Sequence, residues 1–118
     1  MRRVVLLSLL AALAVPGTAA AASTFRTAAN NIACVGSGGQ VRCDLRESTA
    51  ETPSRPASCQ LDYGLFFGVS ATASSGRRLC AGDTVLGSAS GTLYPGRTWR
   101  HGSIRRTATA RGAVRCTN

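Results

Sequence analysis

The sequence predicts a small all-β domain, a barrel or sandwich of short antiparallel strands with Gly-rich turns and disulfide staples. Three observations lead to this fold class. Apolar residues alternate with polar ones over short runs, and no stretch beyond the N-terminal segment keeps a helical period of 3.6 residues for three turns. Five cysteines lie within 118 residues. A motif that carries cysteine also occurs twice, which predicts two similar hairpins.

The first 22 residues are predicted to be a secretory signal peptide. Two arginines follow the initiating Met, an apolar run extends from Val4 to Val15, and three alanines precede a cleavage site before Ser23. A membrane anchor is the competing interpretation, but a spanning helix needs roughly 20 apolar residues and this run is shorter. We therefore expect the mature chain to begin near Ser23 and to be secreted, either to the extracellular space or to the cell envelope.

Residues 23–118 are predicted to form a single secreted domain, because so short a chain cannot divide its apolar residues between two cores. All five cysteines lie in this part, where oxidising conditions allow disulfides to persist and to supplement a small core. A zinc site would need closely spaced ligands, but there is no Cys-x-x-Cys pair and His101 is the only histidine. We therefore expect disulfides and neither a metal nor a cofactor.

The first copy of the repeated motif predicts a β-hairpin closed by a disulfide. Ile32 and Cys34 share one face of a strand, as do Val41 and Cys43, because side chains alternate with a period of two. The sequence Gly-Ser-Gly-Gly at 36–39 supplies the turn. Residues directly opposite in a non-hydrogen-bonded antiparallel pair have Cα atoms about 4.5 Å apart, near the lower end of disulfide geometry. Cys34 and Cys43 are therefore the first predicted bridge.

The second copy of the motif has nearly the same spacing but lacks one cysteine. Residues 104–106 and 114–116 match the first copy, with Arg106 at the position of its first cysteine. The two marked positions are nine residues apart in the first copy and ten in the second. The sequence therefore predicts a six-cysteine framework that has lost one member, in which Arg106 lies across a strand pair from Cys116.

This repeat leaves Cys59 and Cys80 as the second predicted bridge and Cys116 as a free thiol. A loop of the size between Cys59 and Cys80 contributes roughly 3 kcal/mol of stability by chain entropy. A guanidinium buried without a partner costs several kcal/mol, so we expect Arg106 to turn outward or its surroundings to be open to water. Cys116 should then be exposed, reactive and able to link two copies of the chain. A thiol left by sequence drift, with no role, would explain the same pattern.

The remaining strands are predicted from alternation and turn residues. Residues 65–71 alternate as a half-buried strand does, and Ser-Ser-Gly at 74–76 predicts a turn into a strand at 77–80. Residues 47–58 contain two prolines and mostly small polar residues, so they are predicted to form a loop. Two weaker strand candidates follow at 84–86 and 91–94.

Short motifs follow one another through nearly the whole mature chain. They are Phe-Arg-Thr at 25–27, Asn-Ile-Ala-Cys at 31–34, Val-Arg-Cys-Asp at 41–44, Cys-Gln-Leu-Asp-Tyr-Gly at 59–64, Cys-Ala-Gly-Asp-Thr-Val at 80–85, Leu-Tyr-Pro-Gly at 93–96, Trp99, and Val-Arg-Cys-Thr-Asn at 114–118. In this order they resemble a family of small secreted bacterial proteins classed only as a domain of unknown function. The resemblance implies a six-cysteine protein and brings no activity, because none is established for the family.

Three differences separate the chain from that family. Arg106 replaces the fifth cysteine, and the sequence ends at Asn118, where relatives look as if they continue into a Gly-His-Gly-Phe-like segment. Ala28, Ala29 and Asn30 stand where the family typically has Pro, Ser and Gly. Asn is tolerated in place of Gly if Asn30 adopts a left-handed conformation.

Basic charge is the sequence's main indication of function. Without Arg2 and Arg3, the chain has twelve arginines, no lysine and five acids, a net charge of +7. Residues 23–83 hold six of the arginines and all five acids. The other six arginines lie in residues 84–118, which contain no acid: Arg97, Arg100, Arg105, Arg106, Arg111 and Arg115.

This C-terminal charge favours anionic partners, such as envelope polymers, lipid head groups or extracellular nucleic acid. The planar fork of arginine suits bidentate contact with phosphate or carboxylate. The same composition has a simpler explanation. A sequence without lysine and rich in Ala, Gly and Arg reflects genome base composition, and a basic surface also keeps a protein soluble.

The sequence argues against an enzyme. His101 would have to serve as the general base, and the adjacent Arg100 disfavours its protonated form. No Gly-x-Ser-x-Gly motif occurs, and a carboxylate pair such as Asp62 and Asp83 would serve glycoside chemistry only if both faced one cleft. We therefore expect a non-catalytic binding or envelope-associated protein. A small envelope hydrolase or a hydrolase inhibitor is the alternative.

Overall fold

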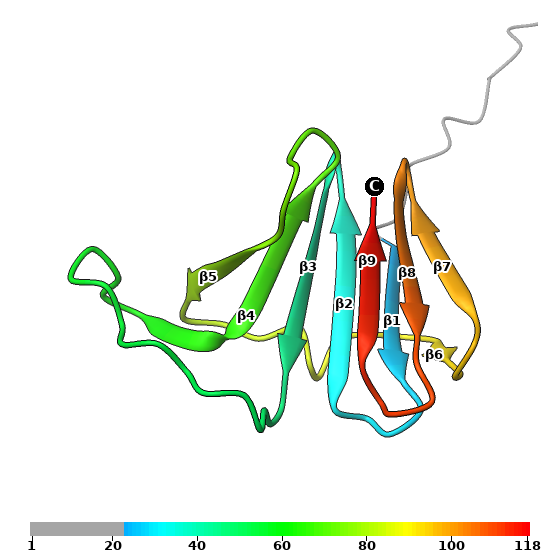
Figure 1. The fold of residues 1–118 in the computed structure, drawn as a ribbon, viewed down its shortest axis with the longest axis horizontal. Helices are drawn as coiled ribbons and strands as arrows, with labels where there is room; N and C mark the ends of the chain where they lie inside the picture. The colour runs from blue at the N-terminus through cyan, green and yellow to red at the C-terminus, as the bar shows by residue number, and fades with distance from the viewer. Residues whose placement is uncertain (1–22) are drawn as a thin grey trace, which may run out of the picture.

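The computed structural model describes residues 23–118, so the predicted signal peptide at 1–22 lies outside the described residues. The described part of the chain forms nine strands and no helix, and hence no helix that could cross a membrane (Figure 1). The strands are β1 Ser23–Thr27, β2 Ile32–Ser37, β3 Gln40–Leu45, β4 Asp62–Ser70, β5 Arg77–Ala81, β6 Thr92–Leu93, β7 Thr98–His101, β8 Ile104–Ala108 and β9 Val114–Thr117. The predicted all-β class is confirmed.

The strands form two sheets that pack face to face. The larger sheet has the order β5-β4-β3-β2-β1-β6, and its pairs are antiparallel except for β1 and β6. The smaller sheet has the antiparallel order β7-β8-β9. Figure 1 shows the smaller sheet in front of the end of the larger sheet that contains β1 and β2, with β4 and β5 extending beyond it. Of the two predicted architectures, the structure is the sandwich.

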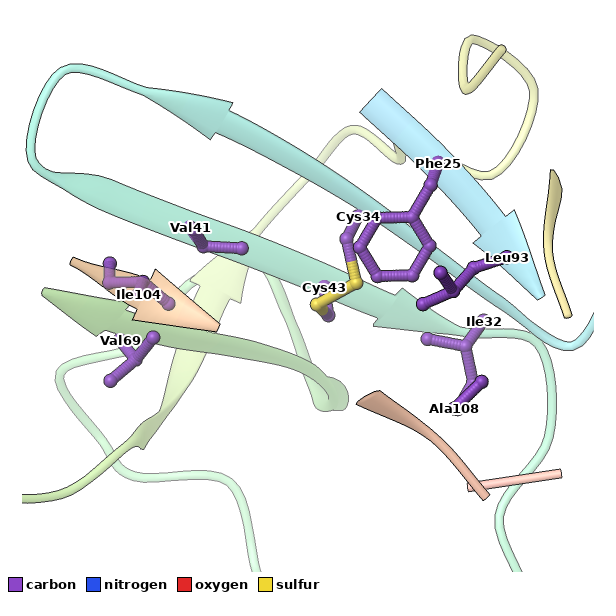
Figure 2. Packing of buried hydrophobic residues seen from close by; sticks show 9 residues of the cluster. All are labelled: Phe25, Ile32, Cys34, Val41, Cys43, Val69, Leu93, Ile104 and Ala108. Atoms are coloured by element: carbon purple, nitrogen blue, oxygen red, sulfur yellow. A yellow bond between two sulfur atoms is a disulfide. The ribbon is translucent and has the colours of Figure 1, made fainter. Parts of the chain in front are cut away.

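Nine buried apolar residues fill the space between the sheets (Figure 2). Most come from the larger sheet, while the smaller sheet contributes Ile104 and Ala108 from β8. Burial alternates along β8, because Ile104, Arg106 and Ala108 are buried whereas Arg105 is exposed. The larger sheet supplies Phe25, Ile32, Cys34, Val41, Cys43, Val69 and Leu93. A strand's period of two therefore decides which side chains enter the core.

The β2–β3 hairpin forms in the predicted register. Cys34 lies opposite Cys43 with a Cα–Cα distance of 4.1 Å, and the two sulfur atoms are bonded inside the core (Figure 2). Gly38 in the turn has a φ of 56°, a conformation that favours glycine. Gly36 is needed for another reason, since a Cβ at this position would collide with the ring of His101 from the smaller sheet.

An aromatic contact holds β7 against β1. The rings of Trp99 and Phe25 have centroids 4.9 Å apart and are tilted by 55°. The indole Nε1 of Trp99 donates a hydrogen bond of 2.9 Å to the hydroxyl of Ser23. Buried indole nitrogens usually find such a partner, so this contact orients the smaller sheet on the larger.

The connections agree with the sequence except in one region. Residues 47–58 form a loop as predicted, and Asn30 has a φ of 55°, which confirms the left-handed conformation expected there. The strand predicted at 84–86 is wrong, because this segment bends and turns. The backbone N–H of Val85 donates to a carboxylate oxygen of Asp44 at 2.9 Å, so a contact with the larger sheet replaces strand pairing. The candidate at 91–94 shortens to β6.

Candidate anion-binding site

Three arginines from neighbouring strands share the outer face of the smaller sheet. Arg100 on β7, Arg105 on β8 and Arg115 on β9 are exposed and alternate with residues that face the larger sheet. Arg100 lies directly opposite Arg105. Arg115 pairs with Thr107, which makes it a diagonal neighbour of Arg105. We call these three residues the arginine triad.

Threonines occupy the positions between the triad residues. Thr98 lies opposite Thr107, and their hydroxyl oxygens are 3.0 Å apart. Thr117 lies opposite Arg105 at the other end of the same face. Threonine suits an exposed strand position, and its hydroxyl both donates and accepts hydrogen bonds. The outer face therefore presents guanidinium groups and hydroxyls.

The arginine triad has no acidic partner within the described residues. Both salt bridges found among residues 23–118 belong to Arg42, and residues 84–118 contain neither Asp nor Glu. Like charges directly opposite in an antiparallel pair are destabilising, so Arg100 and Arg105 repel each other. An anion bound across the face would relieve that repulsion.

The first hairpin shows how the same motif position is neutralised. Arg42 occupies the place in the first Val-Arg-Cys motif that Arg115 occupies in the second. Its Nε and Nη2 donate to the two carboxylate oxygens of Asp44 at 2.8 and 2.9 Å, and its Nη1 donates to Asp83 at 2.9 Å. The hydrogen bonds that Arg42 donates to Asp44 raise the pKa of Arg42, and Arg42 lowers the pKa of Asp83. Thr117 replaces Asp44 in the second motif, so Arg115 lacks this partner.

The other predicted anion-binding arginines lie elsewhere. Arg97 and Arg111 are exposed, but Arg97 precedes β7 and Arg111 lies in the turn between β8 and β9. Arg106 is only 7% exposed and faces the larger sheet. Of the two alternatives expected for Arg106, the outward turn is therefore wrong, and the side chain instead lines a cleft between the sheets.

Strand geometry explains the burial of Arg106. Ile104 and Ala108 lie on the same face of β8 and are 0% and 4% exposed. A shift of one residue would turn Arg106 outward, but it would also expose Ile104 and bury Arg105. Burial lowers the pKa of the Arg106 guanidinium, and interaction with Cys116 partly opposes that shift.

The cysteines are placed as the repeat predicts. Cys59 and Cys80 form a bridge with a Cα–Cα distance of 5.7 Å, and Cys116 is the free cysteine of residues 23–118. Cys116 lies opposite Arg106 as predicted. It was expected to be exposed, but it is half-buried. Within the same residues no group of His, Cys, Asp and Glu side chains could hold a metal ion.

Two of the residues considered for catalysis, His101 and Asp83, make structural contacts. The Nε2 atom of His101 lies 2.7 Å from the carbonyl of Gly38 and must donate, because a carbonyl only accepts. The same ring stacks on Trp99 with an interplanar angle of 9°. Asp83 binds Arg42 on the outer side of the larger sheet. These contacts join loops and sheets and bring no base to a nucleophile.

The sequence contained a signal for the arginine triad that net charge alone did not reveal. Arg and Thr alternate with inward residues at 98–101, 105–107 and 115–117. Because side chains alternate with a period of two in these segments, Arg105 and Arg106 are expected on opposite faces of their strand. The strand order that joins the segments into one face comes from the structure.

Comparisons of the chain with protein-family models, with curated proteins and with solved structures found no match.

Proposed function

We propose that this protein binds an anionic polymer of the cell envelope, without catalysis, through the outer face of the smaller sheet. The observation that carries the proposal is the arginine triad, three exposed guanidinium groups on one face that have no acidic partner in the described part of the chain. The signal peptide predicted from the sequence supports a location where such polymers occur.

The spacing of the triad suits repeated anionic groups. Neighbouring strands lie roughly 5 Å apart, and diagonal neighbours on one face lie roughly 7 to 8 Å apart. Arg100 and Arg105 lie directly opposite each other on neighbouring strands, and Arg115 is the diagonal neighbour of Arg105. Each guanidinium can make bidentate hydrogen bonds to a phosphate or carboxylate group. A chain with several negative charges would therefore contact more than one arginine at once.

The composition of the face favours a polymer over a lipid surface. Among the described residues the large exposed apolar side chains are Leu61 and Tyr94, and neither belongs to β7, β8 or β9. Peripheral membrane proteins generally insert an apolar face into the lipid layer as well as contacting head groups. The outer face offers charge and hydroxyls without such an anchor.

The test compares two triple variants that remove the same charge. One variant replaces Arg100, Arg105 and Arg115 with Gln. The control replaces Arg46, Arg55 and Arg77 with Gln; these three arginines are exposed and lie outside the smaller sheet. Binding of fluorescent inorganic polyphosphate is measured over a range of salt concentrations. Each lost contact should reduce the slope of log affinity against log salt by about 0.7 to 0.9. The triad variant should lose about 2 to 3 units of slope, and the control should lose little.

Two results would overturn the proposal. Equal losses in both variants would show that net charge alone binds the probe, which is the simpler explanation of the basic composition. Binding to anionic vesicles that depends on the triad and exceeds binding to polyphosphate would assign the face to lipid instead.

A further inference from the structure

A cleft opens between the sheets, on the face of the smaller sheet opposite to the arginine triad. It has a volume of about 370 Å³ and lies between β9 and the strands β3 and β4. Most of its wall is apolar, with Ile32, Leu45, Phe67 and Val69 on the larger sheet and Val114 on β9. Clefts of roughly 300 Å³ or more are large enough for a small organic ligand.

Arg106 places a positive charge in this apolar cleft. The residue is 7% exposed, and its Nε is fully covered with no hydrogen-bond partner in the described part of the chain. Its terminal nitrogens are not among the fully covered atoms and take part in no hydrogen bond of residues 23–118, and Arg106 lines the cleft. Isolated buried charges are strongly destabilising, so proteins usually pair them.

No acidic group pairs with Arg106 in the part of the chain that the structure describes. The cleft lining includes neither Asp nor Glu, and the terminal carboxylate of Asn118, which also lines the cleft, forms no salt bridge with Arg106. Cys116, directly opposite on β9, also lines the cleft and is the only other side chain there that can carry charge. The unpaired guanidinium is therefore available to a ligand.

We propose that this cleft binds a small monocarboxylate with an aliphatic chain. The guanidinium of Arg106 holds the carboxylate, since its fork matches the two oxygens, and one cation balances one negative charge. A phosphate monoester would bring a second negative charge for which the cleft has no cation. The apolar wall covers the aliphatic chain, and the cleft volume limits the chain to medium length.

Three probes separate charge from chain in a calorimetric titration of residues 23–118. Octanoate has both the carboxylate and the chain, acetate has only the charge, and octanol has only the chain. Octanoate is expected to bind at least about tenfold more tightly than either of the others, because a hydrogen bond to a charged group adds to apolar burial. Equal binding of octanoate and octanol would overturn the role of Arg106.

Matched variants locate the site. Arg106→Gln should weaken octanoate binding about tenfold or more, whereas Arg97→Gln removes the same charge from an exposed position outside both the cleft and the arginine triad and should leave octanoate binding unchanged. Equal effects of the two variants would show that octanoate responds to net charge. Thermal unfolding establishes that both variants fold before they are compared.

A second measurement uses the unaltered protein and remains decisive if Arg106→Gln does not fold. Cys116 lines the cleft, so bound octanoate should slow its alkylation by iodoacetamide several-fold. Octanol at the same concentration should have little effect. Unchanged alkylation at an octanoate concentration that saturates the calorimetric signal would place the ligand outside this cleft.

Discussion

The two hairpins that carry the repeated motif have the same register but differ in how they are closed. In the β2–β3 hairpin, a disulfide joins Cys34 to Cys43 across the strands. In the β8–β9 hairpin, Arg106 lies opposite Cys116 and no covalent bond closes the pair. The second hairpin thus reaches the motif's register without its bridge, which shows that the disulfide is not needed to align these strands.

The apolar residues of the motif account for this shared register. Ile32 and Ile104 stand two residues before the marked position and are 7% and 0% exposed. A slip of one residue would move either side chain from the core to solvent. Burying such a side chain contributes roughly 1.5 to 3 kcal/mol, so each hairpin is held by its inward face.

The outer faces of the hairpins differ more than their inner faces. Arg42 is neutralised by Asp44 and Asp83, and this cluster lies against the segment between β5 and β6. Arg115 has threonines around it and no acidic partner among residues 23–118. Within the described residues, one outer face is therefore covered by the chain itself, whereas the other is left open. This difference is the physical basis for proposing that the smaller sheet binds anions.

Breaking the first hairpin's bridge should produce the largest change. The double variant Cys34→Ala, Cys43→Ala is expected to lose about 4 kcal/mol of unfolding free energy, from roughly 3 kcal/mol of chain entropy and from lost packing in the core. Urea denaturation followed by circular dichroism measures it. The control is the double variant Cys59→Ala, Cys80→Ala, which opens a longer loop. If chain entropy were the only contribution of a bridge, this control would lose more unfolding free energy than the variant of the first bridge. A larger loss in the control would deny a packing role to the first bridge.

Completing the second hairpin should have a stabilising effect of roughly 3 kcal/mol. Arg106→Cys places a second thiol opposite Cys116 and removes an unpaired buried cation. The melting temperature should rise under oxidising conditions, and any covalent dimer formed through Cys116 should disappear. Arg105→Cys is the matched control, since its side chain points to the opposite face. Peptide mapping that finds Cys116 still free in Arg106→Cys would contradict the register.

Giving the second hairpin the acid of the first should reduce its affinity for polyanions. Thr117→Asp introduces a carboxylate beside Arg105 and Arg115, at the position that Asp44 occupies in the first motif. Polyphosphate binding at low salt should weaken about tenfold, equivalent to about 1.4 kcal/mol. Thr117→Asn serves as the uncharged control and should bind nearly as well as the unaltered protein. Equal affinities for the Asp and Asn variants would show that these arginines do not contact the probe.

The smallest expected effect concerns repulsion within the arginine triad. Arg105→Thr removes one of two directly opposed charges and should raise the unfolding free energy by about 0.5 kcal/mol at low ionic strength. The gain should vanish in 1 M salt, where the Debye length is about 3 Å. Thermal unfolding at both salt concentrations measures it. A gain of the same size at high salt would attribute the effect to strand propensity instead of charge.

Local periodicity accounts for the parts of this structure that were predictable. Alternation and turn residues predicted the β2–β3 hairpin, the half-buried strand β4 and its return through β5. The repeated motif placed Cys34 opposite Cys43 and Arg106 opposite Cys116. These features depend on residues close in the chain, for which spacing determines which side chains meet.

The sequence by itself determined the class of fold, the hairpin register and the excess of positive charge. The tertiary structure alone decided where that charge lies. Arg106 was expected either to turn outward or to lie on a face open to water, because burial of its own charge was considered in isolation. It does not turn outward, since Ile104 and Ala108 hold that face of β8 against the larger sheet. Residues 84–86 became a turn because Asp44, some forty positions earlier, binds the backbone of Val85. Both outcomes depend on contacts between distant segments, and such contacts override local preferences because they bury more surface and satisfy more polar groups.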